Sequence, residues 1–354
     1  MAEGLKRLSL IGPLENFPFQ AFEAIILAVI GVSLGTAIVL GLKKGWMEHP
    51  PTTAYLMLGR KCLMDCAFCS QARSSRANPF SLSRITWPPF PEEEVISRLE
   101  TIGSSGPLRR ICIQVTHSPK AFQKTLDLIR KLKERVPLPM DASFLPKNLS
   151  EVQALFEAGL DHLGFGLDAA SERVFTQTKG LGWENLIRMI EETASHYPGR
   201  VAVHLIVGLG ETEEEMVRMI QRMHDLGAIV GLFAFTPLAG TRMENCPPPS
   251  LKSYRRIQIA RHLIVHNLAR AEDFSFSEEG KLLAFPPLDL KKLLSDGEAF
   301  RTSGCPDCNR PYYNERPSGP LYNFPYPPSP AEVRQALREA EIDSASSKLM
   351  EPYG

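Results

Sequence analysis

The sequence predicts an α/β fold, a (β/α) barrel that is complete or slightly open. Two observations lead to this prediction. Eight short apolar runs lie beyond residue 53, and helix-like segments separate them. The chain has 354 residues, 44% hydrophobic and 23% charged, so it can bury a large core as one big domain or two smaller ones.

The expected strands and helices alternate along the chain. The strands are Ala54 to Leu58, Arg110 to Thr116, Leu138 to Ser143, His162 to Leu167, Val201 to Val207, Ile229 to Phe235, Phe274 to Ser277 and Glu298 to Thr302. The helices are Glu92 to Gly103, Lys120 to Arg135, Ser150 to Ala158, Trp183 to His196, Glu213 to Leu226 and Leu251 to Asn267. Capping boxes are expected at Thr212 with Glu215, and at Ser329 with Glu332, which opens a final helix.

Residues 1–50 form an N-terminal segment before the barrel, which we place at 51–304, and residues 305–354 form a C-terminal segment. Ala24 to Leu42 is free of formal charge and is followed by two lysines. This run is long enough to span a bilayer, so a membrane anchor is one interpretation. Its glycines and the lack of an aromatic belt at both ends favour a helix buried against the barrel.

Charge and cysteine usage narrow the function classes. Forty basic residues balance forty acidic ones, so no overall field favours nucleic acid or anionic lipid. Five of the seven cysteines stand in two tight groups. This pattern indicates metal ligation in a reducing compartment, and hence a cytoplasmic protein, over disulfides.

The first group, Cys62, Cys66 and Cys69, follows the first expected strand in one loop. Three thiols at this spacing can hold three corners of an iron-sulfur cube and leave the fourth iron open. Structural zinc sites are closed by four ligands, usually two separate pairs, and fit poorly.

These residues resemble the radical S-adenosylmethionine (SAM) superfamily, whose motif is C-x3-C-x2-C with an aromatic residue before the last cysteine; here it is Phe68. The resemblance implies a [4Fe-4S] cluster whose open iron binds SAM, with Phe68 near the adenine. An electron from the cluster would split SAM into methionine and a 5'-deoxyadenosyl radical.

Two strand ends carry further candidates for cofactor binding. His204 to Glu211 resembles the family's G-x-I-x-G-x-x-E motif, with His204 in place of the first glycine, which implies that Gly208 and Glu211 support the adenine. Plain turn chemistry would explain the glycines equally well. Asp168 ends the fourth expected strand; in biotin synthase-like enzymes an aspartate so placed contacts the nucleoside or substrate. It could instead cap the helix that follows.

The second group, Cys305 and Cys308, follows the last expected strand, which would bring both thiols to the same rim as the first group. A lone C-x2-C is often half of a zinc site, but no free partner pair exists. A second, auxiliary [4Fe-4S] cluster is the better interpretation. By resemblance to biotin synthase, Cys112 is its third ligand; Cys246 is a weaker candidate.

If the auxiliary cluster has fewer than four cysteine ligands, one of its irons could be held by a weaker ligand, for which we consider Ser275, Ser277 or Ser303. Its sulfide could then be transferred to a substrate, which makes Cys305 and Cys308 catalytic. This is the chemistry of biotin and lipoyl synthases, and the resemblance to the biotin synthase group runs from Tyr55 to the C-terminus. Asp141 and Ala202 fall near two further biotin synthase cluster cysteines.

The closest resemblance is to the paired radical SAM proteins that build the lipoyl cofactor. It rests on residues 70–73, 82–88 and 305–317. It implies an octanoylated lipoyl carrier protein as substrate, a second radical SAM partner chain, and a reductant protein such as a ferredoxin.

Two other functions remain open. One is a biotin synthase-like or other radical SAM enzyme acting on a free small molecule. The other is a non-catalytic iron-sulfur or zinc protein with a membrane anchor. The proline- and tyrosine-rich stretch Arg310 to Pro328 is either a lid or docking surface, or a strap closing the bottom of the barrel. Ser344 to Gly354 is expected to fray.

Overall fold

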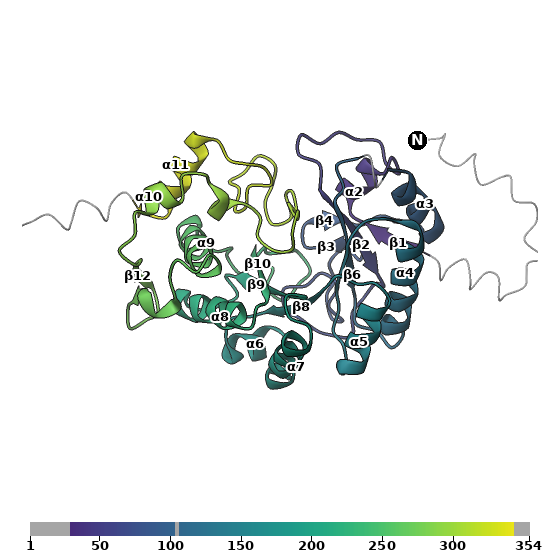
Figure 1. The fold of residues 1–354 in the computed structure, drawn as a ribbon, viewed down its shortest axis with the longest axis horizontal. Coiled ribbons are helices and arrows are strands. Elements are labelled where there is room, and N and C mark those ends of the chain that lie inside the picture. Colours follow the sequence, from purple (N-terminus) through teal and green to yellow (C-terminus); the bar gives the residue numbers. More distant parts are fainter. Residues whose placement is uncertain (1–28, 103–105, 343–354) are drawn as a thin grey trace, which may run out of the picture.

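The computed structural model describes residues 29–102 and 106–342. Its centre is an eight-stranded sheet in the order β10-β9-β8-β7-β6-β2-β1-β5 (Figure 1). Six strands are parallel, and β1 runs antiparallel to β2 and β5. The bounds are β1 (Val29–Val32), β2 (Thr53–Leu58), β5 (Pro89–Pro91), β6 (Arg110–Val115), β7 (Met140–Ser143), β8 (His162–Asp168), β9 (Val201–Val207) and β10 (Ile229–Ala234).

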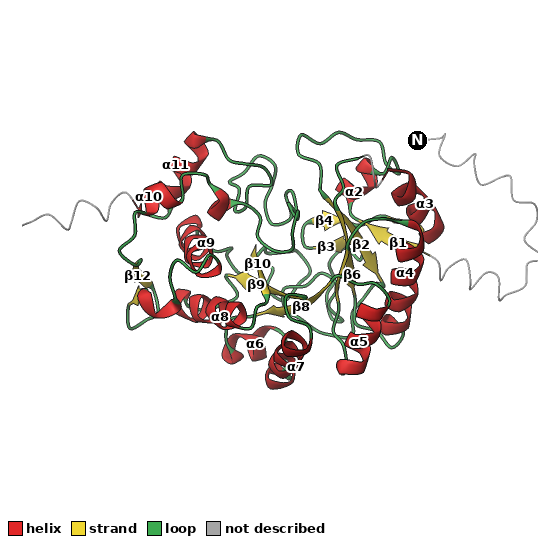
Figure 2. Ribbon diagram, viewed as in Figure 1, coloured by secondary structure: helices red, strands yellow, loops and turns green. Residues whose placement is uncertain are grey.

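The helices cover the outer face of this sheet, as Figure 2 shows, while the sheet curves around a lumen. Because both faces of the parallel strands are covered, β2 is buried along its whole length. The helices are α2 (Leu34–Val39), α3 (Glu92–Ile102), α4 (Ala121–Arg135), α5 (Leu149–Glu157), α6 (Glu172–Thr178), α7 (Trp183–His196), α8 (Glu213–Asp225), α9 (Leu251–Val265), α10 (Leu290–Leu293) and α11 (Pro330–Glu339). Both predicted capping boxes are present, at the starts of α8 and α11.

The barrel is open, as one form of the prediction allowed, because the last two expected strands do not join it. Residues 275–276 form β11 (Ser275–Phe276), which pairs only with β12 (Leu282–Ala284) in a separate hairpin. Residues 298–300 form the 3-10 helix η3 (Glu298–Phe300). A further hairpin joins β3 (Ser81–Leu82) to β4 (Ile85–Thr86), and a second 3-10 helix is η2 (Ala271–Asp273).

The long N-terminal helix is not found. Within the part of residues 24–42 that is described, the chain forms β1 and the six-residue α2. Gly31 lies in β1 against Met57, so this segment extends the sheet edge instead of crossing the barrel as a helix. No helix of the described residues is long and apolar enough to cross a membrane. Residues 24–28 and the tail from residue 344 lie outside the described residues.

The C-terminal segment fills the open side of the barrel between β10 and β2. On one side, the Leu232 amide donates to the Ser303 hydroxyl at 2.8 Å. On the other, the Thr52 amide donates to Asn309 Oδ1 at 3.0 Å. Arg310, the first residue of the proline- and tyrosine-rich stretch, also bonds both sides: its guanidinium donates to the Leu232 carbonyl and its amide to the Tyr55 hydroxyl, each at 3.2 Å. The start of that stretch therefore lies as a strap where a closed barrel has further strands, and the lid or docking role stays a prediction.

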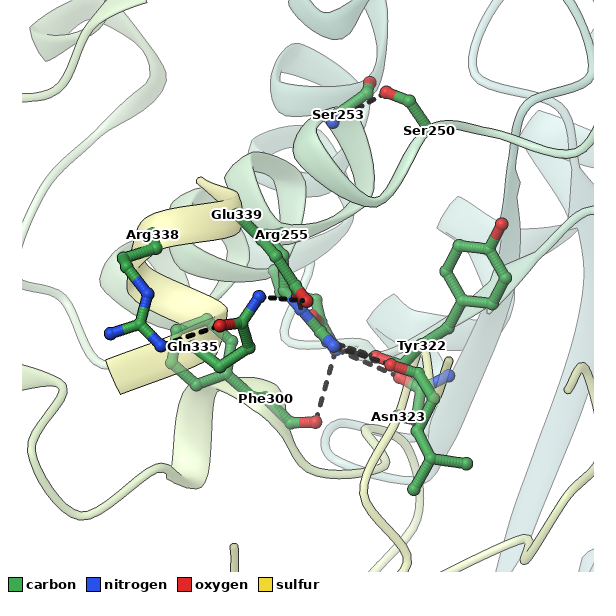
Figure 3. Close-up of polar contacts among 11 residues, drawn as sticks. Ser250, Ser253, Arg255, Phe300, Tyr322, Asn323, Gln335, Arg338 and Glu339 are labelled. Carbon is green, nitrogen blue, oxygen red and sulfur yellow. Dashed lines mark hydrogen bonds and ion pairs between the residues drawn. The ribbon is translucent and has the colours of Figure 1, made fainter. Parts of the chain in front are cut away.

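Arg255 of α9 holds the continuation of this segment in place (Figure 3). Its guanidinium donates to the carbonyls of Leu321 and Tyr322, both at 2.6 Å, and pairs with Glu339 of α11 at 2.9 Å. The Arg255 side chain is only 3% exposed, so these partners have no water to replace it.

We expect Arg255→Met to lower the free energy of unfolding by about 3 kcal/mol, because the Leu321 carbonyl and the Glu339 carboxylate lose this buried donor, and the Tyr322 carbonyl keeps only Gln258. Urea denaturation of the apoprotein measures the change. Arg338→Met is the matched control, since the Arg338 side chain is exposed and its hydrogen bond within the described residues is to Gln335; its effect should stay within about 0.5 kcal/mol. Equal losses for both variants would contradict the role given to Arg255.

Candidate functional site

The first cysteine group sits on a tight loop at the carboxyl end of β2. Gly59 begins the loop with a φ of +80°, and a side chain there would collide with the Thr116 hydroxyl. Cys62 Sγ accepts backbone N–H groups of Met64 at 3.4 Å and His117 at 3.2 Å. Cys69 Sγ accepts the Gln71 N–H at 3.4 Å. Amides aimed at sulfur in this way stabilise thiolates.

The three thiols of this group lie close enough to affect one another electrostatically. Burial raises the pKa of Cys66 to about 11 and that of Cys69 to about 12, and the neighbouring thiols add to the rise. Without a metal, both are therefore neutral thiols near pH 7.

The cysteines face a cavity of about 260 Å³, which we call the upper cavity because it lies at the carboxyl ends of the parallel strands. Phe68 also lines it. Much of the remaining wall is apolar, formed by Met57, Leu82, Val115, Ile206, Phe233, Phe235 and Leu238. A wider hollow shares Cys62 and Cys66 with this cavity.

Asp168 also lines the upper cavity and has a buried cation beside it. Its φ is +64°, and its Oδ2 lies 2.6 Å from Lys179 Nζ. Burial alone would lower the pKa of Lys179, but the charge of Asp168 and its hydrogen bond to the ammonium raise it above its usual value. Asp168 does not cap the next helix: the N-cap of α6 is Ser171, which makes no side-chain capping bond.

Gly208 and Glu211 are not among the residues that line the upper cavity. Glu211 instead accepts the backbone N–H groups of Gly208 at 2.6 Å and Leu209 at 2.9 Å, so it holds its own turn together. Burial raises the pKa of Glu211. From the same motif, His204 and Ile206 do reach the cavity.

A second, smaller cavity of about 50 Å³ contains the other thiols that the sequence singled out. We call it the lower cavity because Thr53, Arg110 and Asp141 of its wall stand at or near the starts of β2, β6 and β7. Cys112, Cys305 and Cys308 line it together, and so does Ala202. Tyr55 bonds Cys308 Sγ through its hydroxyl at 3.2 Å.

This position corrects two expectations. Cys305 and Cys308 do not reach the carboxyl rim, because the chain enters from η3 and not from a barrel strand. None of the three candidate serines lines the lower cavity: Ser275 and Ser277 lie at the outer hairpin, and the Ser303 hydroxyl is bonded to Leu232. Cys246 lines neither cavity.

The two cavities share one wall, formed by Gln114, His204, Phe233 and Tyr313. Gln114 Nε2 donates to Cys112 Sγ at 3.0 Å. Burial and the charge of Arg310 lower the pKa of His204 to about 4, so its imidazole is neutral near pH 7. Burial raises the pKa of Tyr313, and the thiols Cys69 and Cys112, one from each cavity, add to the rise.

Several of these residues escaped the sequence analysis. Lys179, Gln114 and Tyr55 carry no local motif. Arg310 and Tyr313 stand within residues 305–317, which carry one of the resemblances noted from the sequence. The sequence did not indicate which residues they contact. The Arg310 guanidinium lies 3.8 Å from the centre of the Phe233 ring.

The donor sets suit clusters better than single ions. Across the described residues, no three His, Cys, Asp or Glu side chains converge on one point where a single ion could be held. A cluster takes each thiolate on a different iron, so its ligands need not converge. Three thiols around an apolar cavity, two of them accepting backbone amides, fit an iron-sulfur cluster with one open iron.

Residues 56–223 match the family model described as "Radical SAM superfamily". The chain is similar to a biotin synthase of Desulforudis audaxviator, with 29% identity over 208 residues, which cover 58% of this chain and 62% of that protein. It is also similar to a biotin synthase of Clostridium acetobutylicum, with 25% identity covering 64% and 68%. The chain thus spans under two thirds of the first relative's length.

Among solved structures, HydG, a maturase of the [FeFe]-hydrogenase, has a similar fold. The TM-score is 0.50 at 12% identity, over 60% of this chain and 50% of that chain. This likeness bears on the fold alone.

We expect alkylation of Cys66 and Cys69 in the apoprotein to rise about tenfold per pH unit between pH 8 and 10, because the thiolate reacts and the raised pKa values keep it scarce. A free thiol with a pKa of about 8.5 should instead level off above pH 9. Mass spectrometry after brief iodoacetamide treatment measures both. A plateau near pH 9 for the two protein thiols would contradict their burial.

Proposed function

Since the chain carries a radical SAM domain of the biotin synthase-like group, we propose that it inserts sulfur into an unactivated C–H bond of a protein-bound octanoyl chain. The sulfur would come from an auxiliary iron-sulfur cluster. The observation that carries this proposal is the pair of thiol-lined cavities that share one wall inside the barrel.

In the upper cavity, Cys62, Cys66 and Cys69 would hold a [4Fe-4S] cluster with one iron open for SAM. When bound, this cluster supplies the electron that cleaves SAM to methionine and a 5'-deoxyadenosyl radical. The amides of Met64, His117 and Gln71 would stabilise the thiolates. The buried Lys179 puts a positive charge beside them, and Asp168 is placed to meet polar groups of SAM.

In the lower cavity, Cys112, Cys305 and Cys308 would hold the auxiliary cluster, for which we propose a second [4Fe-4S]. In the overall change, the substrate C–H bond would be replaced by a C–S bond. The 5'-deoxyadenosyl radical would take the hydrogen atom, and the auxiliary cluster would give up the sulfide from its irons and keep the remaining electron. The electron that cleaves SAM would come from a reductant protein such as a ferredoxin. Gln114, His204, Phe233 and Tyr313 line both cavities, so the proposed radical source and sulfur source would lie on either side of one set of side chains.

An octanoyl chain fits the chemistry of the upper cavity, whose wall is largely apolar. The wider hollow beside Cys62 and Cys66 gives a carrier-bound chain room to enter. We propose an octanoylated lipoyl carrier protein as substrate and a second radical SAM chain as partner. The resemblance at residues 70–73, 82–88 and 305–317 supports both.

A second candidate is action on a free small molecule, favoured by the relatives that are named biotin synthases. Asp141 and Ala202 stand at the lower cavity without thiols, which favours the octanoyl proposal over biotin formation.

We expect Cys305→Ala to keep SAM cleavage and to abolish sulfur transfer, because it removes a ligand of the auxiliary cluster only. The assay incubates the reconstituted enzyme with an octanoyl-lysine peptide, SAM and a strong reductant, and detects 5'-deoxyadenosine and added sulfur by mass analysis.

Cys246→Ala is the matched control and should retain both activities. Unmutated protein should contain about eight irons per chain for two four-iron clusters, or about six if the auxiliary cluster has two irons. Sulfur transfer by Cys305→Ala would refute the sulfur-donor role. Sulfur added to a free small molecule but not to the peptide would favour the second candidate.

A further inference from the structure

Unpaired buried polar atoms point to a missing neighbour in the lower cavity. Among the described residues, the buried side-chain atoms without a hydrogen-bond partner are Thr53 Oγ1, Asp141 Oδ2, Ser171 Oγ and Glu315 Oε2. Two of the four, those of Thr53 and Asp141, belong to residues lining this one small cavity. Burying a carboxylate oxygen without a hydrogen-bond partner costs free energy, so the lack of a partner requires an explanation.

The other oxygen of Asp141 is held firmly. Oδ1 accepts from Arg110 Nη1 at 2.7 Å and lies 2.9 Å from His162 Nδ1. Asp141 is 3% exposed, and its register partner in β6 is Cys112. The contacts of Arg110 and His162 with one oxygen orient the carboxylate, and Oδ2 has no partner among them. Asp141 also interacts with the side chain of Cys305, so the carboxylate lies beside a thiol of the cavity, which is how outer groups position a metal ligand.

Arg110 ties this carboxylate to the cysteine loop. Its Nε donates to the carbonyl of Pro306, between Cys305 and Cys308, at 3.1 Å. One buried guanidinium thus fixes Asp141 and the two thiols relative to each other, and its charge offsets that of an anionic ligand set.

We propose that Asp141 Oδ2 is the fourth protein ligand of the auxiliary cluster, beside Cys112, Cys305 and Cys308. This inference rests on the proposed function, which places a cluster there. A carboxylate is a harder donor than a thiolate and binds iron of a cluster less tightly. The iron held by Asp141 is therefore the one most easily released when a bridging sulfide is removed.

Other groups of the cavity are poorer candidates. The guanidinium of Arg310 has no acceptor atom and donates to the carbonyls of Leu232 and Ser303. The Tyr55 hydroxyl is engaged with Cys308 and accepts from the Arg310 amide at 3.2 Å. His204 is neutral and lines the cavity, so it is the competitor that the experiment must test.

The test uses ⁵⁷Fe Mössbauer spectroscopy of full-length protein in which Cys62→Ala, Cys66→Ala and Cys69→Ala remove the first cluster. We expect one auxiliary iron site with parameters of mixed sulfur and oxygen ligation. Asp141→Asn should abolish that site or lower the iron content, because the amide keeps an oxygen for Arg110 and His162 but loses the anionic donor. Asp141→Cys should restore full iron content with only sulfur-ligated sites.

Asp161→Asn is the matched control: its carboxylate accepts the Met140 amide at 2.7 Å and does not line the cavity, so the spectrum should not change. An unchanged spectrum in Asp141→Asn overturns the assignment and leaves the proposed function intact. Loss of the distinct site in His204→Gln, but not in Asp141→Asn, assigns the ligand to histidine. Absence of iron from the triple variant overturns the auxiliary cluster and this inference together.

Discussion

The incompleteness of the barrel is the constraint on which the site depends. The six parallel strands end at β10, so the barrel leaves a side that the C-terminal segment must fill. Because that segment runs through the gap, it brings Cys305, Cys308 and Tyr313 into the lumen. Arg255 anchors the continuation of the same segment from behind. The same segment therefore closes the barrel and forms part of the lower cavity.

Buried cations set the electrostatics of both cavities. Lys179 lies beside the first cysteine group, and Arg110 and Arg310 lie beside the second. Thiols that are buried resist ionisation, so nearby positive charge would favour the anionic clusters that we propose for both groups. Each of these cations is also bonded to a carboxylate or to carbonyl oxygens, and their partners hold them in place.

None of the four side chains in the wall that separates the two cavities is charged near pH 7. His204 is neutral, Phe233 is apolar, and burial keeps the Tyr313 hydroxyl protonated. Such a wall suits a radical intermediate, because it offers no charged group that would draw water between the two sites. His204 stands where the motif that this stretch resembles has glycine. Its ring fits there because Gly164 and Gly231 leave room for it.

The sequence by itself determined the features that depend on neighbouring residues. These are the alternation of strands and helices, the capping boxes, and the cysteine loop with Phe68. The spacing of the three cysteines alone fits a cluster. The tertiary structure decided what depends on contacts distant in the chain. The strand expected at 274–277 forms at residues 275–276 but pairs with β12 outside the barrel, and the strand expected at 298–302 is replaced by η3, because a short apolar run joins a sheet only where a neighbouring strand pairs with it. Lys179, Gln114 and the unpaired oxygen of Asp141 gained their places in the site only when the barrel curved and the C-terminal segment closed it.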